Sequence, residues 1–160
     1  MTKILKPLFL TVMLMMTLCS VSFAATPHLI ADSHAALGGI TAGTDEQTVK
    51  SIYGEPGSKD SMFDRGLNAT VDVWNYGGSF EIYFANSQAF MIKTVKNNGI
   101  ATPDGFTVGT SYQTVYNGLG EPMLKQKNSL WYRTVNGLEL VFNFDGNNKV
   151  KEIRTGVNKM

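Results

Sequence analysis

The residue types with the most obvious chemistry lie near the N-terminal end, where Asp32 stands between His28 and His34. Imidazole and carboxylate groups can ligate zinc or act as general bases. The two histidines do not have the i, i+4 spacing of a helical metal site, and no third ligand is evident. These are also the only histidines available as a base for a hydrolase nucleophile. We expect both to be solvated, and we expect no metal and no cofactor.

Two glutamates recur in Gly-Glu-Pro turns, Glu55 and Glu121. Paired carboxylates can perform acid–base catalysis, but a duplicated sequence repeats every residue it contains, and a glutamate in a turn is usually solvated. The turn at 145–148 lacks the regular ligand spacing of a calcium loop. The sequence therefore predicts no catalytic residue and a protein that is not an enzyme.

The first 24 residues are typical of an export signal. Lys3 and Lys6 precede a short apolar run from Leu8 to Leu18, and residues 22–24 end in Ala24 with the small-x-small pattern of a cleavage site. The apolar run is well short of the roughly 20 residues that a membrane-spanning helix needs. We expect cleavage near Ala24, no membrane span afterwards, and a periplasmic or secreted protein.

The only cysteine, Cys19, lies within this signal. A lipidated cysteine usually follows a small residue, whereas Leu18 precedes this one. The mature chain would therefore have no thiol and no disulfide, which favours a bacterial envelope over an animal secretory route.

The charge of the mature chain excludes one class of partner. Loss of Lys3 and Lys6 leaves 12 of the 14 basic residues against 13 acidic ones, and these charges are interspersed. Such a near-neutral chain has no electrostatic footprint for nucleic acid.

The chain contains an internal repeat at an offset of 66 residues. Within residues 39–56, ten positions are identical to the second copy: Gly39, Thr41, Gly43, Thr44, Gln47, Thr48, Val49, Gly54, Glu55 and Pro56. Internal similarity of this kind indicates a duplicated structural unit.

The repeated residues predict the two ends of a short helix in each copy. A Thr-x-x-Gln capping box would start each helix, and a glycine followed two residues later by a proline would end it. The residues with these roles are Thr44, Gln47, Gly54 and Pro56 in the first copy and Thr110, Gln113, Gly120 and Pro122 in the second. The expected helices cover 45–53 and 111–119.

Alternating apolar and polar residues follow each helix and predict strands separated by turn residues. The expected strands are 71–76, 80–84 and 90–95 in the first copy and 130–135, 138–142 and 150–154 in the second. The offset between the copies falls from 66 to 58 before these strands, which indicates an eight-residue excess in a loop near 58–68 of the first copy.

These elements predict an α+β fold made of two tandem modules, each a short helical segment packed on a three-stranded antiparallel β-meander. The expected divisions are a signal peptide at 1–24, an N-terminal segment at 25–38, module one at 39–97 and module two at 98–160. Helices of this length are unstable alone, so each must bury its apolar residues against one face of its sheet.

The other sheet face is the candidate binding site. Tyr83, Trp131, Arg133 and Val141 fall on it by the alternation of strand residues. Aromatic residues at positions where polar ones are expected can anchor a partner. Burial of these residues between the two modules is the alternative.

The pattern of Gly43-Thr44, Val49 and Gly54-x-Pro56, followed by an aromatic residue and a hydrophobic strand pair, resembles the module of the SmpA/OmlA (BamE) family. It is also similar to each half of β-lactamase inhibitory protein and to tandem exported proteins of uncharacterised role in diderm Firmicutes. The resemblance covers 39–96 and 105–155.

This resemblance implies an exported, non-catalytic protein of the bacterial cell envelope that binds a protein partner of unknown identity. The halves of the inhibitory protein pair their sheets into a concave surface, which would place Tyr83, Trp131 and Arg133 within reach of that partner. The alternative that it implies is a secreted or periplasmic inhibitor of an enzyme, either a β-lactamase or a protease. A hydrolase that uses His28 or His34 is the least favoured reading.

Overall fold

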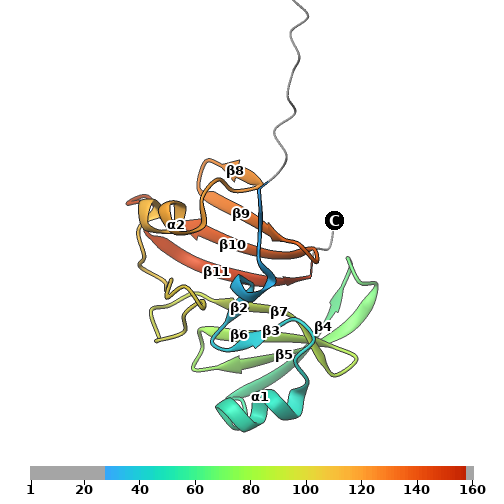
Figure 1. The fold of residues 1–160 in the computed structure, drawn as a ribbon. Helices are drawn as coiled ribbons and strands as arrows, with labels where there is room; N and C mark the ends of the chain where they lie inside the picture. Colours follow the sequence, from blue (N-terminus) through green and yellow to red (C-terminus); the bar gives the residue numbers. More distant parts are fainter. Residues whose placement is uncertain (1–27, 158–160) are drawn as a thin grey trace, which may run out of the picture.

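The computed structural model describes residues 28–157, so the predicted export signal lies outside the described residues. Figure 1 shows the fold. The helices are a 3-10 turn, η1 (Asp32–His34), and two α-helices, α1 (Glu46–Tyr53) and α2 (Tyr112–Leu119). The strands are β1 (Leu29–Ile30), β2 (Ala36–Leu37), β3 (Ile40–Thr41), β4 (Ser58–Asp64), β5 (Ala69–Tyr76), β6 (Phe80–Ala85), β7 (Gln88–Thr94), β8 (Leu124–Gln126), β9 (Ser129–Thr134), β10 (Leu138–Phe144) and β11 (Val150–Val157).

Nine of these strands form one mixed sheet. Its order is β1-β9-β10-β11-β7-β6-β5-β4, and β8 pairs with β9 beside this path. Strand β1 runs parallel to β9, and the other neighbours are antiparallel. The ribbon of β2 and β3 is separate.

The prediction of two tandem modules, each a helix on a three-stranded meander, is therefore wrong. Strands β7 and β11 pair antiparallel, with Lys93 opposite Arg154 and Met91 opposite Gly156, and this seam joins both predicted meanders into one sheet. The physical reason is that a meander leaves unpaired backbone groups at each edge. Pairing β7 with β11 satisfies one edge from each half.

One apolar core lies on the helix side of this sheet. Residues Ile82 and Phe84 of β6 and Leu140 and Phe142 of β10 belong to the same buried cluster, as the sequence predicts for the helix-facing positions. The helices contribute Val49, Val115 and Leu119 to this cluster. Both helices and the β2–β3 ribbon lie on the near face of the sheet in Figure 1. We call the opposite face, which carries neither helix, the outer face.

The segment before α1 is structural rather than solvated. Leu37 and Ile40 are fully buried in the core. His34 Nδ1 lies 2.7 Å from Asp104 Oδ2, and Asp32 accepts hydrogen bonds from the backbone and side-chain amides of Asn136. His34, expected to be solvated, remains partly exposed but pairs with Asp104. The described N-terminal residues tie β9, the core and the loop before α2 together.

The caps of the two α-helices differ by one residue from the prediction. The N-caps are Asp45 and Ser111, whose side chains accept hydrogen bonds from the backbone amides of Thr48 and Thr114 at 2.8 and 3.1 Å. Thr44 Oγ1 instead accepts from the amide of Thr41. The capping boxes assigned to Thr44 with Gln47 and to Thr110 with Gln113 are therefore wrong, because each threonine closes the turn that precedes its helix.

The same correction holds in the second half, where Thr110 Oγ1 accepts from the amide of Thr107 at 3.0 Å. Gly54 and Gly120 follow the helices at φ 75° and 76°, with ψ near −160° in both. This combination is open essentially only to glycine. Pro56 and Pro122 follow two residues later, beyond each helix end.

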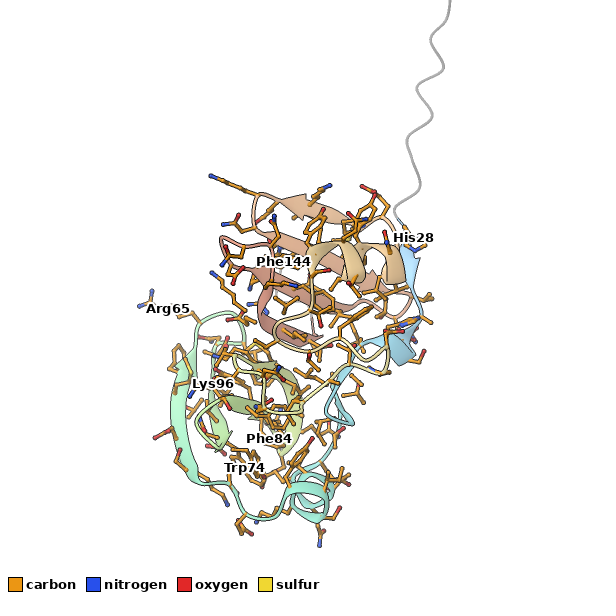
Figure 2. All side chains as sticks on the ribbon, turned by 90° about the vertical axis from the view of Figure 1, so that its left-hand side faces the viewer. His28, Arg65, Trp74, Phe84, Lys96 and Phe144 are labelled. Atoms are coloured by element: carbon orange, nitrogen blue, oxygen red, sulfur yellow. The ribbon has the colours of Figure 1, made fainter. Side chains whose placement is uncertain are left out.

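The eight-residue excess near 58–68 is a hairpin and not a loop. Strand β4 pairs with β5 along its whole length, from Ser58 opposite Asn75 to Asp64 opposite Ala69. Arg65, at the tip of this hairpin, projects away from the body of the molecule, on the side opposite α1 (Figure 2).

Among residues 28–157, no helix is long and apolar enough to cross a membrane.

Candidate functional site

A row of side chains crosses the outer face from one half of the sheet to the other. Directly opposite residues in neighbouring strands share a face. The register therefore aligns one residue from each of five strands, β9, β10, β11, β7 and β6: Trp131, Val141, Arg154, Lys93 and Glu81. We call these five residues the outer row. It crosses the seam between β11 and β7.

Trp131 and Arg154 form a cation–π contact at one end of the outer row. The guanidinium carbon of Arg154 lies 5.3 Å from the ring centroid, and the indole Nε1 donates to Ser129 Oγ at 2.9 Å. Val141 lies between them in register and is only 1% exposed. The prediction that Val141 contacts a partner is therefore wrong, because its side chain is buried in the isolated chain.

Lys93, Glu81 and Tyr83 form a second cluster on the other side of the seam. Lys93 Nζ lies 2.7 Å from Glu81 Oε2, and Tyr83 Oη donates to the same oxygen at 2.6 Å. Burial, followed by this hydrogen bond to Glu81, raises the pKa of the Tyr83 hydroxyl. Burial also opposes ionisation of Glu81, but the hydrogen bonds from Lys93 and Tyr83 outweigh it and lower the pKa of that carboxyl. The cluster therefore holds its charges near neutral pH.

Arg133 and Glu139 face each other on the outer face without a good hydrogen bond. Arg133 Nη2 lies 3.5 Å from Glu139 Oε1, and Glu139 is 9% exposed. Arg133 Nε and Glu139 Oε1 are buried, and neither has a hydrogen-bond partner among the described residues. Unsatisfied buried polar groups are rare in native proteins and need a specific explanation.

The structure thus brings Trp131, Arg133 and Tyr83 to one face, although β9 and β6 lie in different halves of the sheet. Sequence reasoning missed Arg154 and Lys93. Alternation within each strand could have placed them on the outer face. Their alignment with Trp131 and Glu81 depends on the pairing of β7 with β11, for which the sequence has no local signal.

The other chemically interesting residues do not assemble into a site. Among residues 28–157, no group of three histidine, cysteine, aspartate or glutamate side chains could hold a metal ion. Glu55 pairs with Lys50 at 3.0 Å and with Lys59 at 3.2 Å, whereas Glu121 accepts a hydrogen bond from Tyr116. Each recurring glutamate therefore has a separate local partner.

No protein-family model and no curated protein sequence matches this chain. The similarity lies in solved structures. An extracellular protein containing an SCP domain from Bacillus anthracis aligns with a TM-score of 0.55 at 14% identity, over 73% of this chain and 44% of that one. A cysteine-rich secretory protein from Staphylococcus aureus aligns with a TM-score of 0.58 at 11% identity, over 74% and 45%.

These two likenesses concern the fold alone, and this chain spans less than half the length of either protein. A putative β-lactamase inhibitor protein from Streptococcus mutans also aligns, at 14% identity over 70% of this chain and 82% of that one. Its TM-score of 0.32 carries no argument about this chain. These structures do not show the resemblance to the BamE family that the sequence predicts.

Proposed function

We propose that this chain is an exported, non-catalytic protein of the bacterial envelope that binds another folded protein through its outer face. The observation that carries the proposal is the outer row, which crosses the seam and makes one surface from both halves of the sheet. The two proteins of similar fold are an extracellular and a secretory protein, which supports export.

The composition of the outer face supports a protein partner. Tryptophan, tyrosine and arginine are the residues that most often dominate the binding energy of protein interfaces. This face carries Trp131, Tyr83, Arg133 and Arg154, all partly exposed. Their charges are interspersed with those of Glu81, Glu139 and Glu152. A face of this kind suits a protein surface with both apolar and polar contacts.

The Arg133–Glu139 pair supports the same surface from a different observation. Arg133 Nε and Glu139 Oε1 are enclosed, but the two side chains are still 31% and 11% exposed on this face. A partner that covers the pair would exclude water and so strengthen its 3.5 Å contact. This pair therefore belongs in the proposed contact area together with Trp131 and Tyr83.

A photo-crosslinking amino acid at position 131 tests the proposal in the producing cell. We expect it to capture one major protein, and the same amino acid at position 52, an exposed position on α1, to leave that protein uncaptured. With the partner purified, Trp131→Ala should weaken binding by at least tenfold, the effect of a hot-spot residue. Ile52→Ala is the matched control and should bind as tightly as the native chain.

Two results would contradict the proposal. One is capture of the partner only from position 52. The other is normal affinity of both Trp131→Ala and Arg154→Ala. Inhibition of an enzyme is the narrower form of the proposal, and it predicts that the captured partner is a β-lactamase or protease whose activity falls in proportion to the complex formed.

A further inference from the structure

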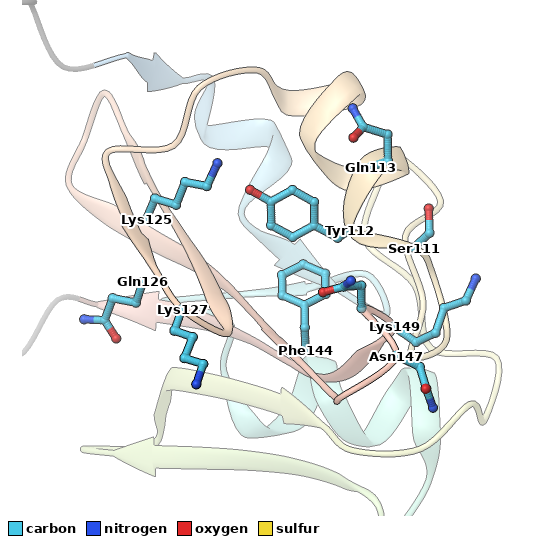
Figure 3. A pocket seen from close by; sticks show the side chains of 10 residues that line it. Ser111, Tyr112, Gln113, Lys125, Gln126, Lys127, Phe144, Asn147 and Lys149 are labelled. Carbon is cyan, nitrogen blue, oxygen red and sulfur yellow. The ribbon is translucent and has the colours of Figure 1, made fainter.

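A cleft of about 600 Å³ opens beside the start of α2, on the helix side of the sheet and away from the outer face (Figure 3). Three segments far apart in the sequence line it: the start of α2, the β8–β9 turn and the β10–β11 turn. The residues used below are Ser111, Tyr112, Lys125, Lys127, Phe144 and Lys149.

The charge of this cleft is one-sided. Lys125, Lys127 and Lys149 line it, and no aspartate or glutamate does. Within residues 28–157 none of these three lysines lies within 4.0 Å of a carboxylate oxygen, whereas Lys50, Lys59 and Lys93 all do. Three like charges around one opening repel each other, and an anion placed between them relieves that repulsion.

Aromatic side chains form the floor of the cleft and hold one lysine in place. The rings of Tyr112 and Phe144 lie 5.1 Å apart, and Lys125 Nζ lies 5.5 Å from the centroid of Tyr112 and 5.3 Å from that of Tyr116. Tyr112 Oη is buried, and its interaction with the ammonium group of Lys125 raises the pKa of that lysine. Two tyrosine rings and one hydroxyl therefore hold Lys125 in place.

The start of α2 adds further positive potential. A helix N-terminus carries a partial positive charge that acidic residues normally offset. In α2 the cap is Ser111, and the first turn contains no acidic residue. In α1 the corresponding cap is Asp45, and Glu46 stands in the first turn. The two helices begin with the same geometry but with opposite electrostatic surroundings.

We propose that this cleft binds a small ligand that carries two or more phosphate groups. Lysine binds phosphate as a point charge. Lys125 and Lys127 come from the β8–β9 hairpin and Lys149 from the β10–β11 turn, so positive charge lies on two sides of the cleft, which suits more than one phosphate. This site is separate from the outer face and does not depend on the proposed protein partner.

Inorganic tripolyphosphate is the probe, titrated into the full mature chain by calorimetry at low and at physiological ionic strength. We expect saturable binding that weakens as salt screens the lysines. The double variant Lys127→Gln/Lys149→Gln should bind at least tenfold more weakly. Lys59→Gln is the matched control, because Lys59 stands 66 positions before Lys125 and is paired with Glu55. It should bind like the native chain.

Ser111→Asp is the sharpest variant. Asp45 caps α1 at the position that corresponds to Ser111 in α2, so an aspartate at position 111 should also cap its helix and leave the fold intact. The substitution places a carboxylate in the cleft beside the lysines. We expect tripolyphosphate binding to be lost with an unchanged circular dichroism spectrum. Normal binding by Ser111→Asp, equal loss in Lys59→Gln, or no binding by the native chain at millimolar probe would each overturn the proposal.

Vesicles distinguish two sources of the phosphate groups. Binding to cardiolipin vesicles, whose headgroup carries two phosphates, but not to phosphatidylcholine vesicles, competed by tripolyphosphate, would assign the cleft to lipid headgroups. Binding of tripolyphosphate without vesicle binding would assign it to a soluble phosphate compound. Both outcomes keep the proposed chemistry.

Discussion

The half of the sheet that follows α1 and the half that follows α2 have similar backbone conformations and hydrogen bonds, but their side chains differ. In the first half, Gly43 N donates to Ala89 O at 2.7 Å, and in the second half Gly109 N donates to Val150 O at the same distance. Both halves also close their helix end in the same way. The hydroxyls of Tyr76 and Tyr132 donate to the carbonyls of Gly54 and Gly120, each at 3.1 Å.

The side chains beside the two helices differ in charge and in how they fill space. In the first half, Lys50 and Lys59 both contact Glu55 and lie over the ring of Trp74, at 5.3 and 4.5 Å from its centroid. In the second half, Lys125 lies over two tyrosines beside an open cleft. The two halves therefore have the same main-chain hydrogen bonds, and they differ at a few exposed side chains that leave a cleft beside α2.

The largest effect that we predict lies at the seam between the halves. A Cβ atom on Gly156 would overlap the carbonyl oxygen of Phe90 and lie 2.8 Å from the Cα of Met91, both of which are backbone atoms and cannot rotate away. Gly156→Ala should therefore lower the free energy of unfolding by about 3 kcal/mol or more, measured by urea denaturation. Gly146→Ala, where a Cβ meets nothing within 4 Å, is the control and should stay within about 0.5 kcal/mol of the native chain. Equal stability of the two variants would mean that the seam is not closely packed.

A smaller effect compares the two helix ends directly. Gly54 and Gly120 have almost the same unusual dihedral angles. A Cβ atom added to either glycine would have no heavy atom nearer than 3.6 Å, so only the backbone conformation opposes a substitution. Gly54→Ala and Gly120→Ala should each cost about 1–3 kcal/mol from backbone strain, and the two costs should agree. A cost at one site and none at the other would show that the shared backbone conformation does not extend to the helix ends.

The smallest effect separates the two N-caps by their response to pH. Hydrogen bonds from the amide and then the hydroxyl of Thr48 lower the pKa of the Asp45 carboxyl in the folded protein. A carboxyl with a lowered folded pKa stabilises the protein above its unfolded pKa of about 3.9, and this stabilisation is lost as the pH falls through the folded pKa.

The destabilisation caused by Asp45→Ala should therefore shrink on acidification from pH 7 to pH 2. Ser111 does not titrate, so Ser111→Ala should cost about 1 kcal/mol at both pH values. Urea denaturation at the two pH values measures this difference. A pH-independent cost of Asp45→Ala would contradict the assigned cap.

The sequence predicted the elements of the fold better than their assembly. The expected helices at 45–53 and 111–119 agree with α1 and α2 to within one residue, since glycine and proline end a helix by local geometry. Strand β4 was missed because it is an edge strand that is exposed along most of its length, so Ser58–Asp64 carries no apolar alternation. Leu37 and Ile40 were missed because two-residue strands leave no periodic signal.

The sites depended on information that one strand does not contain. Alternation placed Trp131 and Tyr83 each on the face of its own meander that carries no helix. Nothing in residues 88–94 or 150–157 shows that these two strands pair with each other, so the sequence did not predict that the two faces are continuous. Val141 was expected to be accessible because alternation predicts the face on which a residue lies but not how deeply it is buried there. The cleft brings together Ser111, Lys125 and Lys149, and only the folded chain gathers them.

The central claim is that both halves form one sheet. Tryptophan fluorescence tests it, because the chain has two tryptophans, Trp74 in the first half and Trp131 in the second. In Trp131→Phe the fluorescence reports the first half, and in Trp74→Phe it reports the second. Within each variant, the urea transition followed by fluorescence should coincide with that followed by far-ultraviolet circular dichroism, because one continuous sheet and core unfold together. A fluorescence midpoint separated from the circular dichroism midpoint in either variant would contradict a single sheet across the seam of β7 and β11.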